Sequence, residues 1–188
     1  MLSFAIAVAV ISCWAIPQRL PAAGPDSGTK VTFAVTNGTF AASPVSGADS
    51  LKLAGQQFSI KVVGNSSMVP VKHGRNWAIF KPLTMTGTVY SQLVPGTAIP
   101  IKSNAVELHQ TAGANEDKFI VTFPVKVLGI ALTVTADIVL PGGTMTKPLI
   151  RPFPNVTLDP TNATVTYANS TAATVLAVQT GTLTATVP

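Results

Sequence analysis

Cysteine is almost absent from this chain: the single copy is Cys13, and everything from Ala15 onward is free of it. Disulfide bonds are therefore excluded as a source of stability in that part of the chain, and so are zinc sites built from cysteine. Stability must come from buried apolar side chains and from hydrogen bonds between backbone segments. Charge is scarce as well, because only 10% of the residues are charged, against roughly 25% in ordinary soluble domains.

Acidic residues and histidines are also few, which limits the catalytic chemistry that the chain can offer. Seven Asp and Glu residues provide few carboxylate pairs for glycoside hydrolysis, and His73 and His109 are the only imidazole bases. No serine-hydrolase elbow, zinc-protease motif, phosphate-binding loop or calcium loop is present. We therefore assign no catalytic residue, no metal ligand and no cofactor, and we do not expect an enzyme. A hydrolase with an unrecognised site stays open as an alternative.

The positive charge is scattered rather than clustered. The net charge is +5, but the basic residues occur singly, apart from the short stretch Lys72–Arg75. Nucleic-acid binding needs a concentrated basic surface, so we expect no nucleic-acid partner.

The N-terminal segment is typical of an export signal. Leu2–Ile11 is apolar and uncharged, and it is shorter than the roughly 20 residues that a membrane-spanning helix needs. Small residues follow at Cys13 and Ala15, where a signal peptidase could cut, and Pro21-Ala22-Ala23 offers a later site. We expect residues 1–23 to form a leader, 24–29 a linker and 30–188 the folded domain, in a secreted or cell-envelope protein. The alternative is that the segment is the first strand or helix of the domain.

The tetrapeptide Val10-Ile11-Ser12-Cys13 resembles the lipobox of bacterial lipoproteins. The resemblance implies lipidation of Cys13 and a lipid anchor. The alternative is an apolar cysteine inside a discarded leader.

Alternation of apolar and polar residues dominates the rest of the chain. Phe119, Val121 and Phe123 share one face, for example, while Ile120 and Thr122 share the other. Such runs are separated by short turn signals, and many short strands with regular turns indicate an all-β fold. We expect a single antiparallel β-sandwich of about 8–10 strands, Ig-like or jelly-roll-like.

Three segments carry more specific predictions. Asn37-Gly38 is a strong hairpin signal. Lys118–Leu140 is long and apolar, but Pro124 and Gly129 interrupt it, so we predict two strands, or one strand bent at Gly129, and no integral membrane span in the mature chain. Gly181–Pro188 is an uncharged terminal strand, which at a sheet edge would favour self-association.

One turn concentrates side chains suited to ligand binding: His73, Arg75, Asn76 and Trp77. An indole can stack on a sugar face while a guanidinium and an amide bond its hydroxyls. The alternative, which we favour, is a polar hairpin loop from which Trp77 enters the core.

These observations indicate an exported, non-catalytic module of the cell surface or extracellular matrix. Its expected mode of action is binding or self-assembly, with itself or another envelope or extracellular protein as partner. A carbohydrate-binding module is the alternative, with a polysaccharide stacked on Trp77, Tyr90 and Tyr167.

Overall fold

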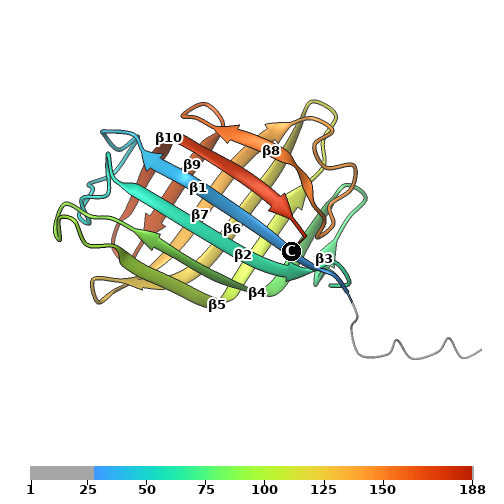
Figure 1. Cartoon of the computed structure of the whole chain (residues 1–188), viewed down its shortest axis with the longest axis horizontal. Coiled ribbons are helices and arrows are strands. Elements are labelled where there is room, and N and C mark those ends of the chain that lie inside the picture. Colours follow the sequence, from blue (N-terminus) through green and yellow to red (C-terminus); the bar gives the residue numbers. More distant parts are fainter. Residues whose placement is uncertain (1–27, 188) are drawn as a thin grey trace, which may run out of the picture.

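A computed structural model describes residues 28–187, and within that range it contains ten β-strands and no helix (Figure 1). The strands are β1 (Lys30–Phe40), β2 (Gln57–Asn65), β3 (Lys72–His73), β4 (Trp77–Val89), β5 (Ile99–Thr111), β6 (Glu116–Val127), β7 (Ile130–Pro141), β8 (Phe153–Leu158), β9 (Ala163–Ala168) and β10 (Ala173–Thr186). The leader and Cys13 lie outside the described residues.

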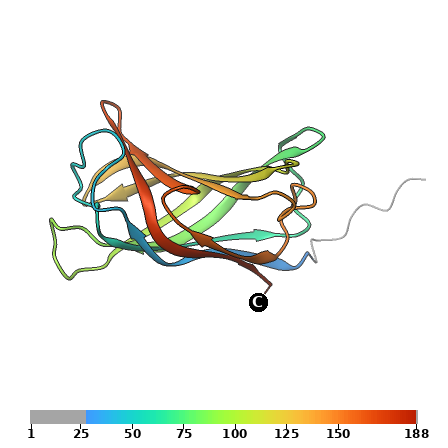
Figure 2. The same ribbon diagram turned by 90° about the horizontal axis from the view of Figure 1, so that it is seen from above.

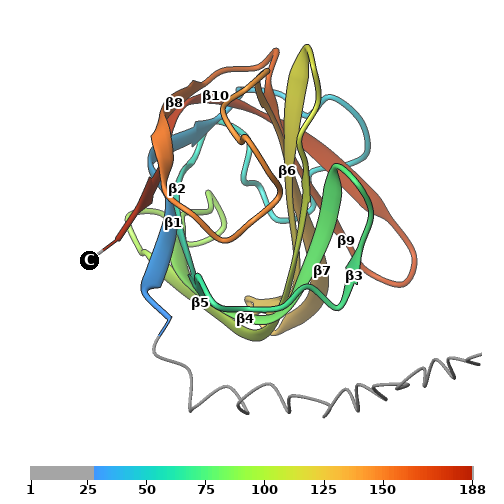
Figure 3. The same ribbon diagram turned by 90° about the vertical axis from the view of Figure 1, so that its right-hand side faces the viewer.

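The strands form one continuous antiparallel sheet that closes on itself. The order β1-β2-β4-β5-β6-β7-β9-β10 returns to β1, because β10 pairs with β1 from Thr32↔Thr186 to Phe40↔Val178. An end-on view shows the resulting ring (Figure 3). Strand β3 lies beside β4, and β8 pairs with the second half of β10. The fold is therefore an eight-stranded barrel with two additional strands.

The all-β, antiparallel prediction is confirmed, but the two packed sheets of a sandwich are not what the structure contains. Period-two alternation requires one apolar face and one polar face on each strand, and both a sandwich and a barrel satisfy it. The difference depends on the β1–β10 pair, which joins the two ends of the domain. The pairing of β1 with β10 cannot be predicted from the local alternation of residues in either strand.

Aromatic and aliphatic side chains from all parts of the barrel fill its interior. Phe33, Phe80, Phe119 and Phe123 are fully buried. The rings of Phe33 and Phe119 lie 5.1 Å apart between centroids, within the range of favourable aromatic pairs. The outer faces of the same strands are rich in threonine.

Asn37-Gly38 does not form a hairpin, contrary to the sequence prediction. Asn37 has a φ of 52°, as its turn propensity requires, but β1 continues to Phe40. The pair forms a bulge, where the register with β2 shifts between Val35 and Gly38. A Cβ on Gly38 would lie 2.6 Å from the Phe58 ring, so glycine is needed for that ring to pack there. The extra residue curves the strand around the barrel.

The segment Lys118–Leu140 forms two strands, as predicted. Strands β6 and β7 are joined by Leu128 and Gly129, whose φ values of 50° and 81° match a two-residue hairpin turn. Within residues 28–187 no helical segment has the length and hydropathy of a membrane span.

The terminal strand is not a sheet edge, so the condition under which we expected it to favour self-association is not met. Strand β10 pairs with β1 on one side, and on the other side it pairs first with β9 and then with β8. Its backbone groups are therefore engaged on both sides over most of its length.

Loops cover both ends of the barrel (Figure 2). At one end, residues 142–152 cross the opening, and Met145 and Ile150 are buried there. Asp117, which is itself fully buried, holds this loop by accepting the N–H of Met145 at 2.6 Å. It also accepts the N–H of Gly113, in the turn before β6, at 2.9 Å. At the other end, residues 41–56 fold inward and bury Leu53.

Candidate functional site

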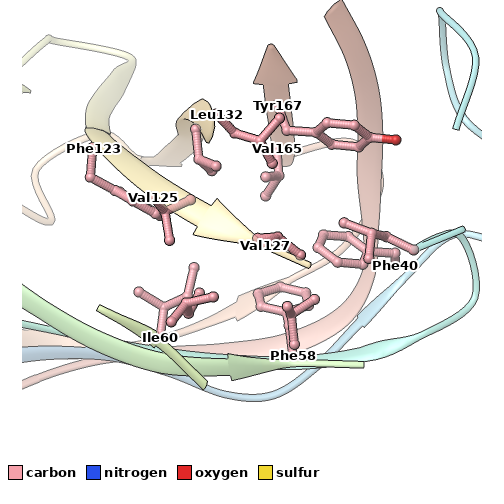
Figure 4. A pocket seen from close by; sticks show the side chains of 13 residues that line it. Phe40, Phe58, Ile60, Phe123, Val125, Val127, Leu132, Val165 and Tyr167 are labelled. Atoms are coloured by element: carbon pink, nitrogen blue, oxygen red, sulfur yellow. The ribbon is translucent and has the colours of Figure 1, made fainter. Parts of the chain in front are cut away.

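The barrel interior holds an apolar cavity of about 40 Å³ below the loop 41–56 (Figure 4). The cavity is small, and its apolar lining offers no polar partners that would hold a water molecule. A second hollow of about 20 Å³ lies deeper in the barrel and shares Ile60 and Phe123 with it. The lining residues of the first cavity are Phe40, Leu53, Phe58, Ile60, Val89, Ile101, Phe123, Val125, Val127, Leu132, Val134, Val165 and Tyr167.

Asp49 anchors the loop above this cavity. Its Oδ1 accepts the Tyr167 hydroxyl at 2.7 Å and the Leu53 N–H at 3.0 Å, and its Oδ2 accepts the Ala54 N–H at 2.8 Å. The Tyr167 hydroxyl is directed away from the other lining side chains (Figure 4), so the only polar atom of the lining is turned toward the loop. The cavity surface is thereby left apolar.

The same contacts set the ionisation of the pair. Burial works to raise the pKa of Asp49, but the N–H groups of Ala54 and Leu53 and the Tyr167 hydroxyl outweigh it, so the pKa is lowered. Burial, reinforced by the neighbouring Asp49 carboxylate, raises the pKa of Tyr167. At neutral pH the carboxylate is therefore ionised and the phenol is protonated.

The barrel wall is split between β5 and β6. These strands pair only from Glu107↔Thr122 to Thr111↔Lys118. Strand β5 extends back to Ile99 and β6 extends on to Val127, so the remaining part of each strand has no partner across this seam. The split lies at the same end of the barrel as the cavity.

Two sequence features account for the split. Val127 and Ile130 form the hydrogen-bonded pair that closes the two-residue hairpin. Because backbone direction alternates along a strand, the N–H groups of odd-numbered β6 residues point toward β7. Those of even-numbered residues point toward β5. Pro124 is even-numbered and has no N–H to offer β5. On the other side, the register of β5 shifts between Ser103 and Val106, and such a bulge bends the strand.

A groove of about 510 Å³ lies along this split. Two of its lining residues, Val125 and Leu132, also line the interior cavity. Val125 and Leu132, which are paired neighbours on β6 and β7, therefore lie at the boundary between the groove and the cavity. No ladder pairing between β5 and β6 extends to this part of the wall. The groove is lined by Pro100, Lys102, Pro124, Val125, Lys126, Ala131 and Leu132.

The turn singled out by the sequence forms a separate groove near the opposite end of the barrel. His73, Arg75 and Trp77 line it together with Lys147 from the loop 142–152, and its volume is about 440 Å³. Asn76 is exposed but is not among its lining residues. The structure thus brings three of the four predicted residues together and adds a cation that sequence spacing did not suggest.

Trp77 does not enter the core, contrary to the alternative we favoured. Ala78 and Phe80 point inward and are buried, so Trp77 lies on the outer face of β4 and is half-buried there. Its ring packs edge-on against His109 at 5.9 Å between centroids. A Cβ at Gly74 would lie 2.2 Å from the indole nitrogen, so the indole covers the turn only because residue 74 is glycine.

The structure assembles no familiar catalytic or metal-binding group within residues 28–187. Neither His73 nor His109 forms a hydrogen bond or ion pair with a carboxylate in that range, and no cluster of three metal-ligating side chains is found there. Asp117 accepts two backbone N–H groups, and the Glu116 carboxylate lies 3.7 Å from the Lys118 ammonium group.

Sequence reasoning missed the β5–β6 groove. Its signal was a repeated pattern, Pro100-x-Lys102 and Pro124-x-Lys126, on two runs of strand-forming residues. Proline and lysine are both common on strands with a free edge.

The molecule is therefore an antiparallel barrel with an apolar interior, whose strands form a ring and whose wall is open between parts of β5 and β6. Comparison with protein families, with curated proteins and with solved structures finds no match.

Proposed function

We propose that this protein is an exported, non-catalytic barrel that binds one small apolar molecule through the split in its wall. The observation that carries the proposal is the position of Val125 and Leu132, which line both the outer groove and the inner cavity. An eight-stranded barrel is just wide enough inside for side chains or one small ligand. Export rests on the apolar segment Leu2–Ile11, which lies outside the described residues.

Size and chemistry both support a small ligand. The groove volume of about 510 Å³ lies within the roughly 300–1,000 Å³ that is typical of small-molecule sites. The cavity behind it is too small for a ligand on its own, so the ligand enters by displacing Val125 and Leu132. The missing β5–β6 pairing supports this route, since no strand pairing has to break between β5 and β6 for Val125 to move.

Titration with a neutral apolar fluorophore, N-phenyl-1-naphthylamine, tests the proposal. Val125→Ala merges the groove with the cavity and should raise the affinity for the probe. Val165→Phe fills the cavity from its far wall and should lower it. Val156→Ala is the matched control, because this buried valine of β8 lines neither space. Equal binding by all four proteins would overturn the proposal.

The Trp77 groove favours a second candidate function, binding of an acidic polysaccharide. An aromatic face lies there beside Arg75 and Lys147, and no acidic residue lines the groove. Retardation in a gel that contains an acidic polysaccharide should be lost in Trp77→Ala and in Lys147→Gln. It should persist in the control Lys30→Gln, which changes an exposed lysine outside the groove. Equal retardation of all variants would exclude this candidate.

A further inference from the structure

The β5–β6 groove carries one lysine on each rim. Lys102 lies on β5 and Lys126 on β6, and both are exposed. Neither forms an ion pair or hydrogen bond with any residue in the range 28–187, where the ion pairs are Lys81–Glu107 and Lys118–Glu116. No acidic residue lines the groove. Two cations therefore line one groove that contains no protein anion to balance them.

The alternation of each strand places these charges above an apolar floor. Neighbouring residues of a strand point to opposite sides, so Lys102 is exposed outside while Ile101 is buried inside. On β6, Lys126 is likewise exposed and Val125 is buried. The site thus has two exposed lysines on its outer side, the aliphatic residues Val125 and Leu132 beneath them, and the apolar cavity inside.

We propose that the ligand is a free, single-chain anionic amphiphile with a carboxylate head, in the manner of a fatty acid. The carboxylate lies between Lys102 and Lys126, and the alkyl chain lies over Val125 and Leu132 and extends into the cavity. Lysine binds such a head as a point charge without demanding a fixed geometry. This inference rests on the proposed function, and it further specifies that the apolar ligand carries a negative charge.

Lysine and proline at a strand edge also have a simpler use, since they prevent a second chain from pairing there. That role predicts association of molecules when the lysines are removed. It predicts no difference between charged and neutral ligands. The two accounts therefore give different results in one experiment.

The experiment compares dodecanoate with dodecanol by calorimetric titration of the wild type and of the double variant Lys102→Gln/Lys126→Gln. Lys61→Gln is the matched control, because Lys61 is exposed on the same row of the outer face, paired through Thr86 with Lys102, but does not line the groove. We expect the double variant to lose about three- to tenfold in affinity for dodecanoate and to keep its affinity for dodecanol. The control should bind both ligands as the wild type does.

Each other outcome overturns the inference in a distinguishable way. Unchanged dodecanoate binding, together with new oligomers of the double variant in sizing chromatography, assigns the lysines to edge protection alone. Equal loss of both ligands makes the lysines structural. If the wild-type protein binds dodecanol but not dodecanoate, the ligand does not have an anionic head group, whereas the proposed apolar site is supported. Wild-type protein that binds neither ligand overturns the proposed function as well.

Discussion

The Tyr167 hydroxyl donates a hydrogen bond of 2.7 Å to Asp49 Oδ1, and this contact joins β9 to the loop over the cavity across 118 residues of sequence. Tyr167 is the one polar side chain of the cavity lining, and this contact ties it to that loop. Leu53, whose N–H binds the same carboxylate oxygen, forms part of the cavity lining. Asp49 therefore fixes both the position of the loop and the shape of the cavity below it.

Tyr167→Phe removes this link and keeps the ring in the lining. We expect a loss of about 1–2 kcal/mol in the free energy of unfolding, because a hydrogen bond to a charged, partly buried group is lost. Urea unfolding measures it, and amide exchange at Leu53 and Ala54 should become faster. Unchanged exchange at these two amides would show that the loop is held by other contacts.

Acid should weaken the same contact. The pKa of Asp49 is lowered in the folded protein, so its contribution to stability is present above the unfolded-state pKa of about 3.9 and is lost as the pH falls through the lower folded-state value. The stability difference between the wild type and Asp49→Asn should therefore be constant near neutral pH and shrink below about pH 4. A difference that stays constant down to pH 2 would contradict this assignment.

Trp77 and Phe80 should respond very differently to truncation. Phe80→Ala empties a fully buried position and should cost about 3–5 kcal/mol. Trp77→Ala removes a half-buried outer ring and its contact with His109, so we expect about 1–2 kcal/mol. Thermal unfolding of the two variants side by side measures the contrast. Equal costs would place Trp77 in the core after all.

Gln110 offers a route to a more stable protein. Its side chain is fully buried, and neither its nitrogen nor its oxygen has a hydrogen-bond partner among residues 28–187. Burying an amide without partners is costly, and an apolar residue of similar shape removes that cost. Gln110→Met should therefore raise the free energy of unfolding by about 1 kcal/mol. A marked loss of stability would mean that the amide has a structural role.

The strand pattern predicted which residues share a face, but not which face is inside. Phe119, Val121 and Phe123 share the inner face of β6, as their alternation with threonine and isoleucine predicts. In β4 both faces carry large apolar residues, so the alternation was compatible with Trp77 inside, as we expected, or with Phe80 inside, as the structure has it. The choice depends on the register with β5, where Ala78 and Phe80 pair with inward residues.

Features that depend on distant pairing were not predictable from local sequence. The Asn37-Gly38 signal correctly indicated a left-handed residue, yet the neighbours of β1 on both sides convert it into a bulge. Barrel closure depends on contacts such as Thr32↔Thr186, at opposite ends of the domain. The groove along β5 and β6 lies where the two strands separate, although Pro124 already indicated a missing donor.

Methyl-labelled NMR with dodecanol tests the central claim most directly, because it reports where an apolar ligand lies. We expect intermolecular contacts from the alkyl chain to the methyl groups of Val125 and Leu132, and shift changes at Ile101 and Val165 across the cavity. The methyl groups of Val156 in β8 should not change. Saturating ligand that leaves Val125 and Leu132 unchanged, or contacts only the outer surface, would contradict a barrel that binds its ligand through the split wall.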